Sequence, residues 1–342
     1  MKILITGGAG FIGCNTAKRF LDAGNEVVIL DNLSRKGSES NLEWLNKQSS
    51  FEFIMGDIRN EDTMREVISD KNSFNVIIHL ASQVAVTSSV LNPREDFEIN
   101  MIGTFNLLEA IRNTAEPPIL LYASTNKVYG ELQNASIQES KVRYEFQDIR
   151  KGIPEDYPLD FHSPYGCSKG GADQYVHDYA RIYEIPTVVL RQSCIYGFRQ
   201  FGVEDQGWIA WFIIASQLGM PITIYGDGKQ VRDILFIDDL IDVFEAVIEY
   251  IDLCRNQVFN IGGGPNNQIS VLELLDEIKE LSGSLPRITF TDWRPGDQLV
   301  YVSNIEKSKS SFGWIPKVDN KTGIAKLYSW VAENIQLFEK QL

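Results

Sequence analysis

A glycine-rich turn directly behind the first apolar stretch restricts the fold of this chain more than any other feature. Lys2–Thr6 (KILIT) is typical of a buried strand, and glycines follow it at positions 7, 10 and 13. Gly7 permits a tight turn, Gly10 lets the backbone approach a diphosphate, and Gly13 lets a helix pack close to the strand. The free N–H groups that begin this helix would hold the diphosphate. The pattern predicts a dinucleotide-binding β-α unit.

An acidic residue follows at the end of the second apolar stretch, Glu26–Leu30 (EVVIL). The carboxylate of Asp31 can accept hydrogen bonds from the adenosine ribose hydroxyls and repel a 2′-phosphate. This favours NAD over NADP, although Arg35 nearby could hold such a phosphate. A tight turn that binds no nucleotide is the alternative interpretation of the glycines.

The other predicted cofactor contacts lie where apolar strands end, because ligands bind at the carboxyl edge of parallel sheets. Asp57 and Ile58 would frame adenine, and Leu80–Gln83 would pass the diphosphate and ribose. The predicted cofactor contacts are Gly7, Gly10, Phe11, Ile12, Gly13, Asp31, Asn32, Ser34, Arg35, Asp57, Ile58, Leu80, Ala81, Ser82, Gln83, Asn100, Ser124, Tyr165 and Lys169.

Short apolar runs alternate with amphipathic stretches over residues 1–190. The predicted strands are Lys2–Thr6, Glu26–Leu30, Phe51–Met55, Asn75–Leu80, Ile119–Ala123 and Thr187–Arg191, and the predicted helices include Phe11–Ala23, Glu61–Ser69 and Arg94–Arg112. Near-continuous apolar runs are typical of parallel strands that are buried on both faces. The alternation predicts an α/β fold, a Rossmann-like doubly wound parallel sheet.

Beyond Arg191, Gly, Pro and aromatic residues become denser and the predicted elements become shorter. These elements are Ile222–Tyr225, Asp238–Ile251, Val258–Ile261, Val271–Leu281 and Ile288–Thr291. We expect residues 1–190 to form an NAD-binding Rossmann domain, with segments near 234–262 returning to its sheet. Residues 191–233 and 263–342 are expected to form a smaller C-terminal α/β lobe that binds a nucleotide sugar.

The charge of the chain argues against several classes of partner. Lys plus Arg is 32 and Asp plus Glu is 46, which gives a net charge of −14. Nucleic acids and anionic membranes attract basic surfaces, so neither is an expected partner. The longest apolar run, Trp208–Ala215, is too short to cross a bilayer. Three histidines and four scattered cysteines form no metal-ligand pattern, and they favour a reducing, cytoplasmic location without a metal.

The segment YGCSK (165–169) places a tyrosine and a lysine one helical turn apart. Ser163 and Pro164 are suited to the N-cap and the first position of that helix. A free phenol has a pKa of about 10. Lys169 and a positively charged nicotinamide ring would both stabilise the phenolate, which would make Tyr165 a general base. Lys169 could also hold the nicotinamide ribose.

Two hydroxyl residues, Ser124 and Thr125, end the fifth predicted strand at the same sheet edge as the nucleotide. A hydroxyl there can hydrogen-bond a substrate oxygen and direct it toward Tyr165, and we assign this role to Thr125. Capping of the following turn is the alternative role for this pair. The predicted catalytic residues are Thr125, Tyr165 and Lys169.

Together, the glycine turn, Asp31, the hydroxyl segment and Y-x-x-x-K resemble the extended short-chain dehydrogenase/reductase superfamily over nearly the whole chain. The stretches STNKVYG (124–130), DFHSPYGCSKGGADQY (160–175), RQFGVEDQGW (199–208) and GKQVRD (228–233) are similar to the CDP-tyvelose (CDP-paratose) 2-epimerase family. This resemblance implies a tightly held NAD and a CDP-linked 3,6-dideoxyhexose that is inverted at C2 through a 2-keto sugar. It also implies a homodimer or homotetramer paired through helices near 94–112 and 165–183.

The predicted substrate contacts lie mainly in the second lobe. Arg232 and Arg294 would bind the diphosphate of CDP, because arginine suits bidentate phosphate contact. Ion pairs with Asp233 and Asp297 are their alternative role. Gln192 and Ile195 depart from the family pattern, in which we expect His and Met, and both bear on the sugar that is accepted. The predicted substrate contacts are Thr125, Asn126, Gln192, Arg199, Gln206, Arg232, Arg294 and Asp297.

Other activities use a similar set of residues. Sugar-nucleotide 4,6-dehydratases that resemble this chain carry an Asp-Glu pair after the catalytic Thr, but this chain has Asn126 and Lys127 there, which disfavours dehydration. A 4-epimerase of UDP-sugars and an NAD(P)-dependent nucleotide-sugar reductase remain open. A catalytically silent NAD-sensing protein is less consistent with intact Thr125, Tyr165 and Lys169.

Overall fold

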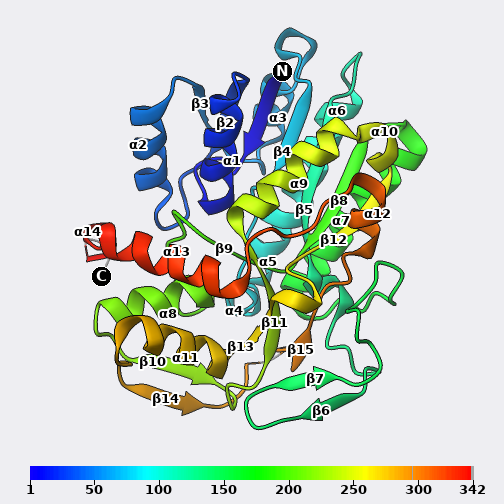
Figure 1. Ribbon diagram of the computed structural model, residues 1–342. Helices are drawn as coiled ribbons and strands as arrows, with labels where there is room; N and C mark the ends of the chain where they lie inside the picture. The colour runs from blue at the N-terminus through cyan, green and yellow to red at the C-terminus, as the bar shows by residue number, and fades with distance from the viewer. Residues whose placement is uncertain (295, 340–342) are drawn as a thin grey trace.

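A seven-stranded, fully parallel sheet forms the centre of the molecule (Figure 1). The computed structural model describes residues 1–294 and 296–339, and the strand order is β12-β8-β5-β4-β1-β2-β3. The strands are β1 (Lys2–Thr6), β2 (Glu26–Asp31), β3 (Glu52–Met55), β4 (Val76–His79), β5 (Ile119–Thr125), β8 (Thr187–Gln192) and β12 (Gln257–Ile261). The predicted Rossmann-like parallel sheet is confirmed, with each predicted strand within two residues of the observed one.

Helices cover both faces of this sheet (Figure 1). The helices of the described residues, some of which lie against the smaller sheets instead, are α1 (Phe11–Asp22), α2 (Ser38–Gln48), α3 (Glu61–Val67), α4 (Val86–Leu91), α5 (Pro93–Phe97), α6 (Gly103–Arg112), α7 (Ser163–Tyr183), α8 (Trp208–Gln217), α9 (Ile237–Glu249), α10 (Ile251–Cys254), α11 (Val271–Ser282), α12 (Glu306–Phe312), α13 (Asn320–Glu333) and α14 (Gln336–Glu339). Ile3 and Ile5 pack in one core cluster with α1 and α9, whereas Leu4 packs in a second cluster with α3, α6 and α7. This alternation explains why the strands are apolar at nearly every position.

The predicted helix over 94–112 contains a π-helical turn, η2 (Glu98–Ile102), between α5 and α6. A π turn inserts an extra residue and re-aims the side chains around it. Asn100, in the middle of this turn, is buried and its amide donates a hydrogen bond to Ser168 of α7 at 3.1 Å. The turn therefore connects this helical segment to the helix that carries Tyr165 and Lys169.

Smaller sheets follow β8 in the chain. Their strands are β9 (Cys194–Tyr196), β10 (Ile222–Tyr225), β11 (Val231–Phe236), β13 (Gln268–Ser270), β14 (Ile288–Thr291) and β15 (Val300–Tyr301). Strand β11 pairs with β9, β13 and β15, and β10 pairs with β14. Since β9 directly follows β8, its pairing with β11 brings residues 192–195 near Arg232. Among the described residues, no helix is long and apolar enough to cross a membrane.

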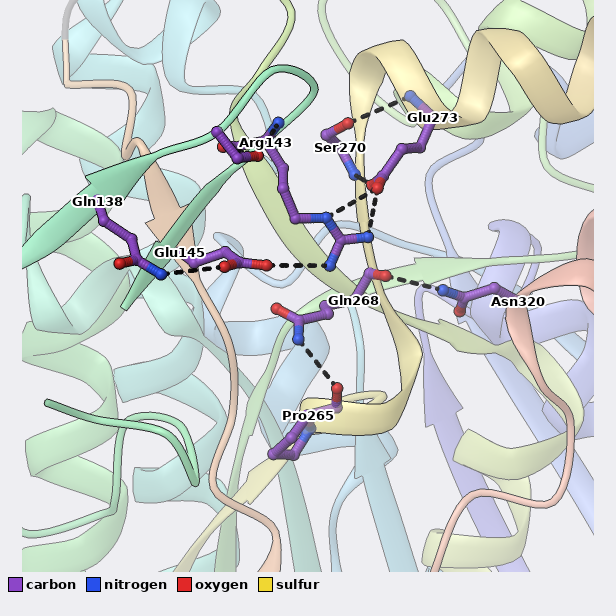
Figure 2. Close-up of polar contacts among 9 residues, drawn as sticks. Gln138, Arg143, Glu145, Pro265, Gln268, Ser270, Glu273 and Asn320 are labelled. Atoms are coloured by element: carbon purple, nitrogen blue, oxygen red, sulfur yellow. Dashed lines mark hydrogen bonds and ion pairs between the residues drawn. The ribbon is translucent and has the colours of Figure 1, made fainter. Parts of the chain in front are cut away.

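A hairpin of β6 (Ile137–Glu139) and β7 (Tyr144–Phe146) is attached to α11 through one arginine (Figure 2). Arg143 donates to the Glu273 carboxylate at 2.8 and 2.5 Å and lies 4.0 Å from Glu145. Glu273 also completes a capping box with Ser270 at the start of α11. One carboxylate therefore caps the helix and holds the hairpin.

Candidate active site

The glycine turn leaves the first N–H groups of α1 available to a ligand. Gly7 has φ +70°, and its carbonyl accepts a hydrogen bond from the Gly10 N–H at 3.0 Å. Gly10 precedes α1 in an extended conformation, and no side chain caps the helix. The N–H groups of Phe11, Ile12 and Gly13 make no hydrogen bond to the described residues. Free donors at a helix N-terminus suit an anionic diphosphate.

Gly13→Ala is expected to abolish tight NAD binding and to lower the melting temperature. A Cβ at Gly13 would collide with the Gly7 carbonyl oxygen and lie 2.5 Å from the Gly8 Cα, both backbone atoms of the turn. Gly24→Ala, just beyond the other end of α1, is the control for NAD binding. A Cβ there meets nothing within 4 Å, and its φ of +78° makes alanine lower the melting temperature without touching the glycine turn. Titration of NAD into each variant tests this, and unchanged NAD affinity in Gly13→Ala would contradict it.

The predicted adenosine-side residues form a polar cluster at the ends of β2 and β3. Asp31 is buried, and its carboxylate accepts the N–H groups of Ala9 at 2.9 Å and Leu33 at 2.8 Å. Burial raises the pKa of Asp31. The carboxylate thus holds the glycine turn against β2, and the ribose contact stays a prediction.

Asp57 is already paired in this structure. Arg59 Nη2 and Asn32 Nδ2 donate to Asp57 Oδ2 at 2.7 and 2.9 Å, and the hydrogen bond with Arg59 is the main reason that the pKa of Asp57 is lowered to about 2. The Asn32 Oδ1 accepts the Ser34 N–H at 3.1 Å. The Ile58 side chain lies in the core, so an adenine contact would have to use its backbone.

The loop after β4 is held by internal hydrogen bonds. Leu80 packs against the core, and Ala81 N donates to Thr6 Oγ1 at 3.3 Å. Gln83 N donates to Asn100 Oδ1 at 2.9 Å, while Gln83 Nε2 donates to Asp96 at 2.8 Å. The cofactor contacts predicted for Gln83 and Asn100 stay predictions. Both amides are used to position the loop, including Ser82, against α7.

The expected cap of the Tyr165 helix is present. Ser163 has φ +65°, and its Oγ accepts the N–H of Gly166 at 3.2 Å. Pro164 follows at the first helical positions. Tyr165 and Lys169 are both buried on α7. Tyr165 lines the same cavity as Thr125 at the end of β5, and the Thr125 side chain is close enough to lower the pKa of the phenol. The structure brings the predicted hydroxyl and the predicted base together.

The surroundings of Tyr165 favour the protonated phenol. Burial is the main reason that its pKa is raised to about 12, and the Asp96 carboxylate acts in the same direction. The Thr125 side chain and the charge of Arg35 oppose this shift. The stabilisation of the phenolate that the sequence assigns to Lys169 stays a prediction.

Lys169 contacts β5 through its ammonium group. Its Nζ donates to the Ala123 carbonyl at 2.6 Å and lies 4.3 Å from the centre of the Tyr122 ring. Burial lowers its pKa to about 7, although Asp173 and Asp96 favour the charged form. The Lys169 ammonium thus lies against the end of β5, and its effect on the pKa of Tyr165 stays a prediction.

A buried polar network lies behind the catalytic residues. Ser124 Oγ donates to Asp173 Oδ2 at 2.6 Å, and Arg191 forms two hydrogen bonds of 3.0 Å with the same carboxylate. Arg191 also donates to the Tyr129 hydroxyl at 3.0 Å, which in turn donates to Asn260 at 2.7 Å. The cofactor contact predicted for the Ser124 hydroxyl is therefore not supported, because that hydroxyl belongs to this network.

A cavity of about 580 Å³ connects the start of α1 with Thr125, Tyr165 and residues of the chain beyond β8, whereas Lys169 does not line it. Phe11 and Ile12 line it at one side, with Thr125 and Tyr165 beside them. The predicted substrate residues that line it are Thr125, Asn126, Gln192, Gln206, Arg232, Arg294 and Asp297. The sequence thus predicts a set of residues that share one cavity.

The cavity arginines are paired with carboxylates. Arg232 contacts Asp297 at 2.6 Å, and Arg294 contacts Asp205 at 3.0 Å. Arg294 also lies 3.8 Å from the centre of the Tyr225 ring. Both arginines line the cavity. A diphosphate that binds to them would have to share each guanidinium with the carboxylate that already contacts it.

The substrate contact predicted for Arg199 is not supported, because this side chain does not line the cavity. Its guanidinium lies 4.5 Å from the Trp44 ring centre and 5.8 Å from that of Trp330. Trp44 belongs to α2 and Trp330 to α13, so Arg199 joins two distant parts of the fold.

The sequence profile of the GDP-mannose 4,6 dehydratase family matches residues 4–327. The CDP-paratose 2-epimerase of Salmonella typhi is 45% identical over 337 residues, which cover 97% of this chain and 99% of that protein. A UDP-glucose 4-epimerase of Thermotoga maritima, solved with UDP-glucose, aligns with a TM-score of 0.83 and 30% identity, covering 98% of this chain and 100% of that chain. For the UDP-glucose 4-epimerase of Thermus thermophilus, solved with NAD, the TM-score is 0.82 and the identity 29%, with 97% and 99% covered.

The chain belongs to the extended short-chain dehydrogenase/reductase family. The residues present fit the NAD of this family on two observations. The first N–H groups of α1 are free to bind a diphosphate, and the cavity extends from them to Tyr165. The three residues predicted to be catalytic, Thr125, Tyr165 and Lys169, are all present in the sequence.

The sequence assigns Arg35 only to the cofactor and gives Lys127 no role in binding. Arg35 donates to Gln206 Oε1 at 3.2 Å and so bridges the loop after β2 and the second lobe. Lys127 lines the cavity two residues beyond Thr125. The signal in the sequence is the position of Lys127 in STNKVYG, just beyond the predicted catalytic hydroxyl. In the sequence, Lys127 serves only to show that the carboxylate pair of the dehydratases is absent.

Proposed function

We propose that this protein is an NAD-dependent epimerase that inverts C2 of a CDP-3,6-dideoxyhexose and converts CDP-paratose to CDP-tyvelose. The observation that carries the proposal is the 45% identity with Salmonella typhi CDP-paratose 2-epimerase over nearly the whole of both chains. Asn126 and Lys127 in place of a carboxylate pair agree with epimerisation rather than dehydration.

Two of the residues that would hold NAD, Phe11 and Ile12, line the cavity. The N–H groups of Phe11, Ile12 and Gly13 would bind its diphosphate, and Asp31 would face the adenosine ribose. Lys169 would hold the nicotinamide ribose. When bound, NAD supplies the acceptor and then the donor of the hydride at C2.

The proton work falls to Thr125 and Tyr165. Thr125 holds the C2 oxygen by a hydrogen bond, while the Tyr165 phenolate takes the proton of the C2 hydroxyl and later returns it. Between these two steps the flat 2-keto sugar turns over in the cavity, so that its other face meets the cofactor. CDP stays bound during this rotation, which is a use of binding energy remote from the reacting carbon. We assign its diphosphate to Arg232 and Arg294, with Asp297 orienting Arg232, and the sugar to Asn126, Gln192 and Gln206.

CDP-paratose converted in heavy water is expected to gain little deuterium at C2, because a hydride and not a solvent proton carries the inversion. NMR of the product measures this directly. The same sample without enzyme controls for spontaneous exchange. Stoichiometric deuterium at C2 would instead require an enolisation route.

A UDP-sugar 4-epimerase is the second candidate, since UDP-glucose 4-epimerases share this fold at 29–30% identity. The two candidates differ in the base and in the carbon that is inverted. A panel of CDP-, UDP-, dTDP- and GDP-sugars, with NMR detection of the epimerised carbon, separates them. Turnover of UDP-sugars at C4 without turnover of CDP-paratose would overturn the C2 assignment.

We further propose a homodimer or homotetramer built on α7 and the helical segment 93–112. Large apolar side chains are exposed on both segments, which is typical of a subunit interface. They are Phe97, Ile102 and Phe105 on one segment and Tyr175 and Ile182 on the other. The division into an NAD-binding part (1–190 and 234–262) and a nucleotide-sugar lobe (191–233 and 263–342), and the cytoplasmic location, also stay predictions.

A further inference from the structure

Lys127 carries a charge in the cavity that no carboxylate of the described residues pairs with. Its Nζ donates to the Gly296 carbonyl at 3.3 Å, a long hydrogen bond to a neutral acceptor. Arg232 and Arg294 line the same cavity, and each forms an ion pair of 3.0 Å or less. Among the described residues, Lys127 is therefore the cation of the cavity that has no ion-pair partner.

Lys127 lies between Thr125, where the sugar is expected to react, and the arginines of the cavity. Lys127 belongs to the short 3₁₀ helix Asn126–Tyr129, and its N–H donates to Thr125 Oγ1 at 3.2 Å. From there the side chain reaches the loop of Gly296. It lies close enough to Arg232 for the charge of that guanidinium to lower the pKa of Lys127. A sugar oxygen at Thr125 and a diphosphate at Arg232 would leave the Lys127 ammonium beside the phosphate that joins them.

The surroundings of Lys127 disfavour its charge until an anion arrives. Burial is the main reason that its pKa is lowered to about 8, and Arg232 acts in the same direction. Asp297, Cys194 and Glu131 favour the charged form, but Asp297 is paired with Arg232 and Glu131 contacts His162 at 3.2 Å. A phosphate oxygen would supply the missing partner, because charge-assisted hydrogen bonds are strong in a poorly solvated site.

We propose that Lys127 is a substrate-binding residue whose ammonium holds the sugar-bearing phosphate of a nucleoside diphosphate sugar. This deepens the proposed function and rests on it for the substrate class. It does not depend on which base is accepted. When the substrate binds, the hydrogen bond from the Lys127 ammonium to the Gly296 carbonyl is replaced by one to a phosphate oxygen. Lys127 then keeps the phosphate in place while the sugar rotates.

The test is calorimetric titration of the NAD-loaded enzyme with CDP, UDP, dTDP and GDP, and with cytidine as the probe that lacks phosphate. The variants are Lys127→Gln, which removes the charge, and Lys127→Arg, which keeps it at all accessible pH values. Lys127→Gln is expected to weaken the preferred diphosphate about 10- to 100-fold, since a hydrogen bond to a charged group is lost. Cytidine affinity should not change. Equal melting temperatures of the three proteins control for folding.

The pH dependence separates binding from a structural role. A group that is charged below pH 8 and neutral above it loses its attraction for phosphate as the pH rises. Wild-type affinity for the diphosphate should fall several-fold between pH ~7 and ~9.5, whereas Lys127→Arg should stay nearly constant. Unchanged affinity in Lys127→Gln would overturn the role of Lys127 alone. Failure of all four diphosphates to bind wild-type enzyme would overturn the proposed function and, with it, this role; tight binding of UDP would change only the base.

Discussion

Tyr165→Phe is expected to lower kcat by about 10²- to 10⁴-fold, the usual contribution of a positioned general acid–base group. The phenol is the group that faces Thr125 in the cavity, and phenylalanine keeps the ring while it removes the proton carrier. The measurement is turnover of CDP-paratose by NMR, together with calorimetric titration of CDP. CDP affinity and the melting temperature should match those of the wild type.

Tyr183→Phe is the matched control at the other end of α7. Its ring is 44% exposed, and it lies outside the cavity, so kcat should not change. Near wild-type turnover by Tyr165→Phe would remove the base assignment. A loss of CDP binding in that variant would instead indicate that the phenol holds the substrate.

Arg191→Met is expected to destabilise the protein by about 3–5 kcal/mol, because it leaves the buried Asp173 carboxylate without its partner. Arg191 and Asp173 are 4% and 0% exposed, and two hydrogen bonds of 3.0 Å join them. The loss is read from urea unfolding followed by circular dichroism. Ser124 is hydrogen-bonded to Asp173, and Tyr129 to Arg191. Loss of the ion pair should therefore also weaken the packing of β5, the strand that ends at Thr125.

A second ion pair on α7 provides the control. Arg181 and Asp178 contact each other at 2.7 Å but are 54% and 51% exposed. Arg181→Met should therefore cost no more than about 1 kcal/mol, the usual range for exposed pairs. Equal losses in the two variants would contradict the idea that burial gives the Arg191–Asp173 pair its importance.

The sheet and the meeting of Thr125 with Tyr165 could be predicted from the sequence for local reasons. Apolar runs, the glycine turn and the Ser163–Pro164 cap each act within a few residues, and parallel strands end at one common edge. Once β5 and β8 are neighbours, the carboxyl ends of both strands, with Thr125 and Gln192, must face the same cavity.

The partners of polar side chains could not be predicted, because they depend on segments far apart in the sequence. Arg199 stacks between Trp44 and Trp330, and nothing near Arg199 in the chain indicates either ring. Asn100 is aimed at α7 by a π-helical turn that has no clear sequence signal. The sequence suggests the neighbouring acids Asp233 and Asp297 as partners of Arg232 and Arg294, respectively. The structure instead pairs Arg232 with Asp297 and Arg294 with Asp205.

The late return of β12 affects how this protein is made. Strand β8 is complete at Gln192, but its outer neighbour spans Gln257–Ile261, after most of the second lobe. On the ribosome, the nascent chain therefore carries an open, apolar β-edge until that later segment has emerged, and an open edge can template pairing between copies. A fragment that stops near residue 190 would keep this edge permanently. The nucleotide-binding half is thus expected to be poorly soluble when it is expressed alone.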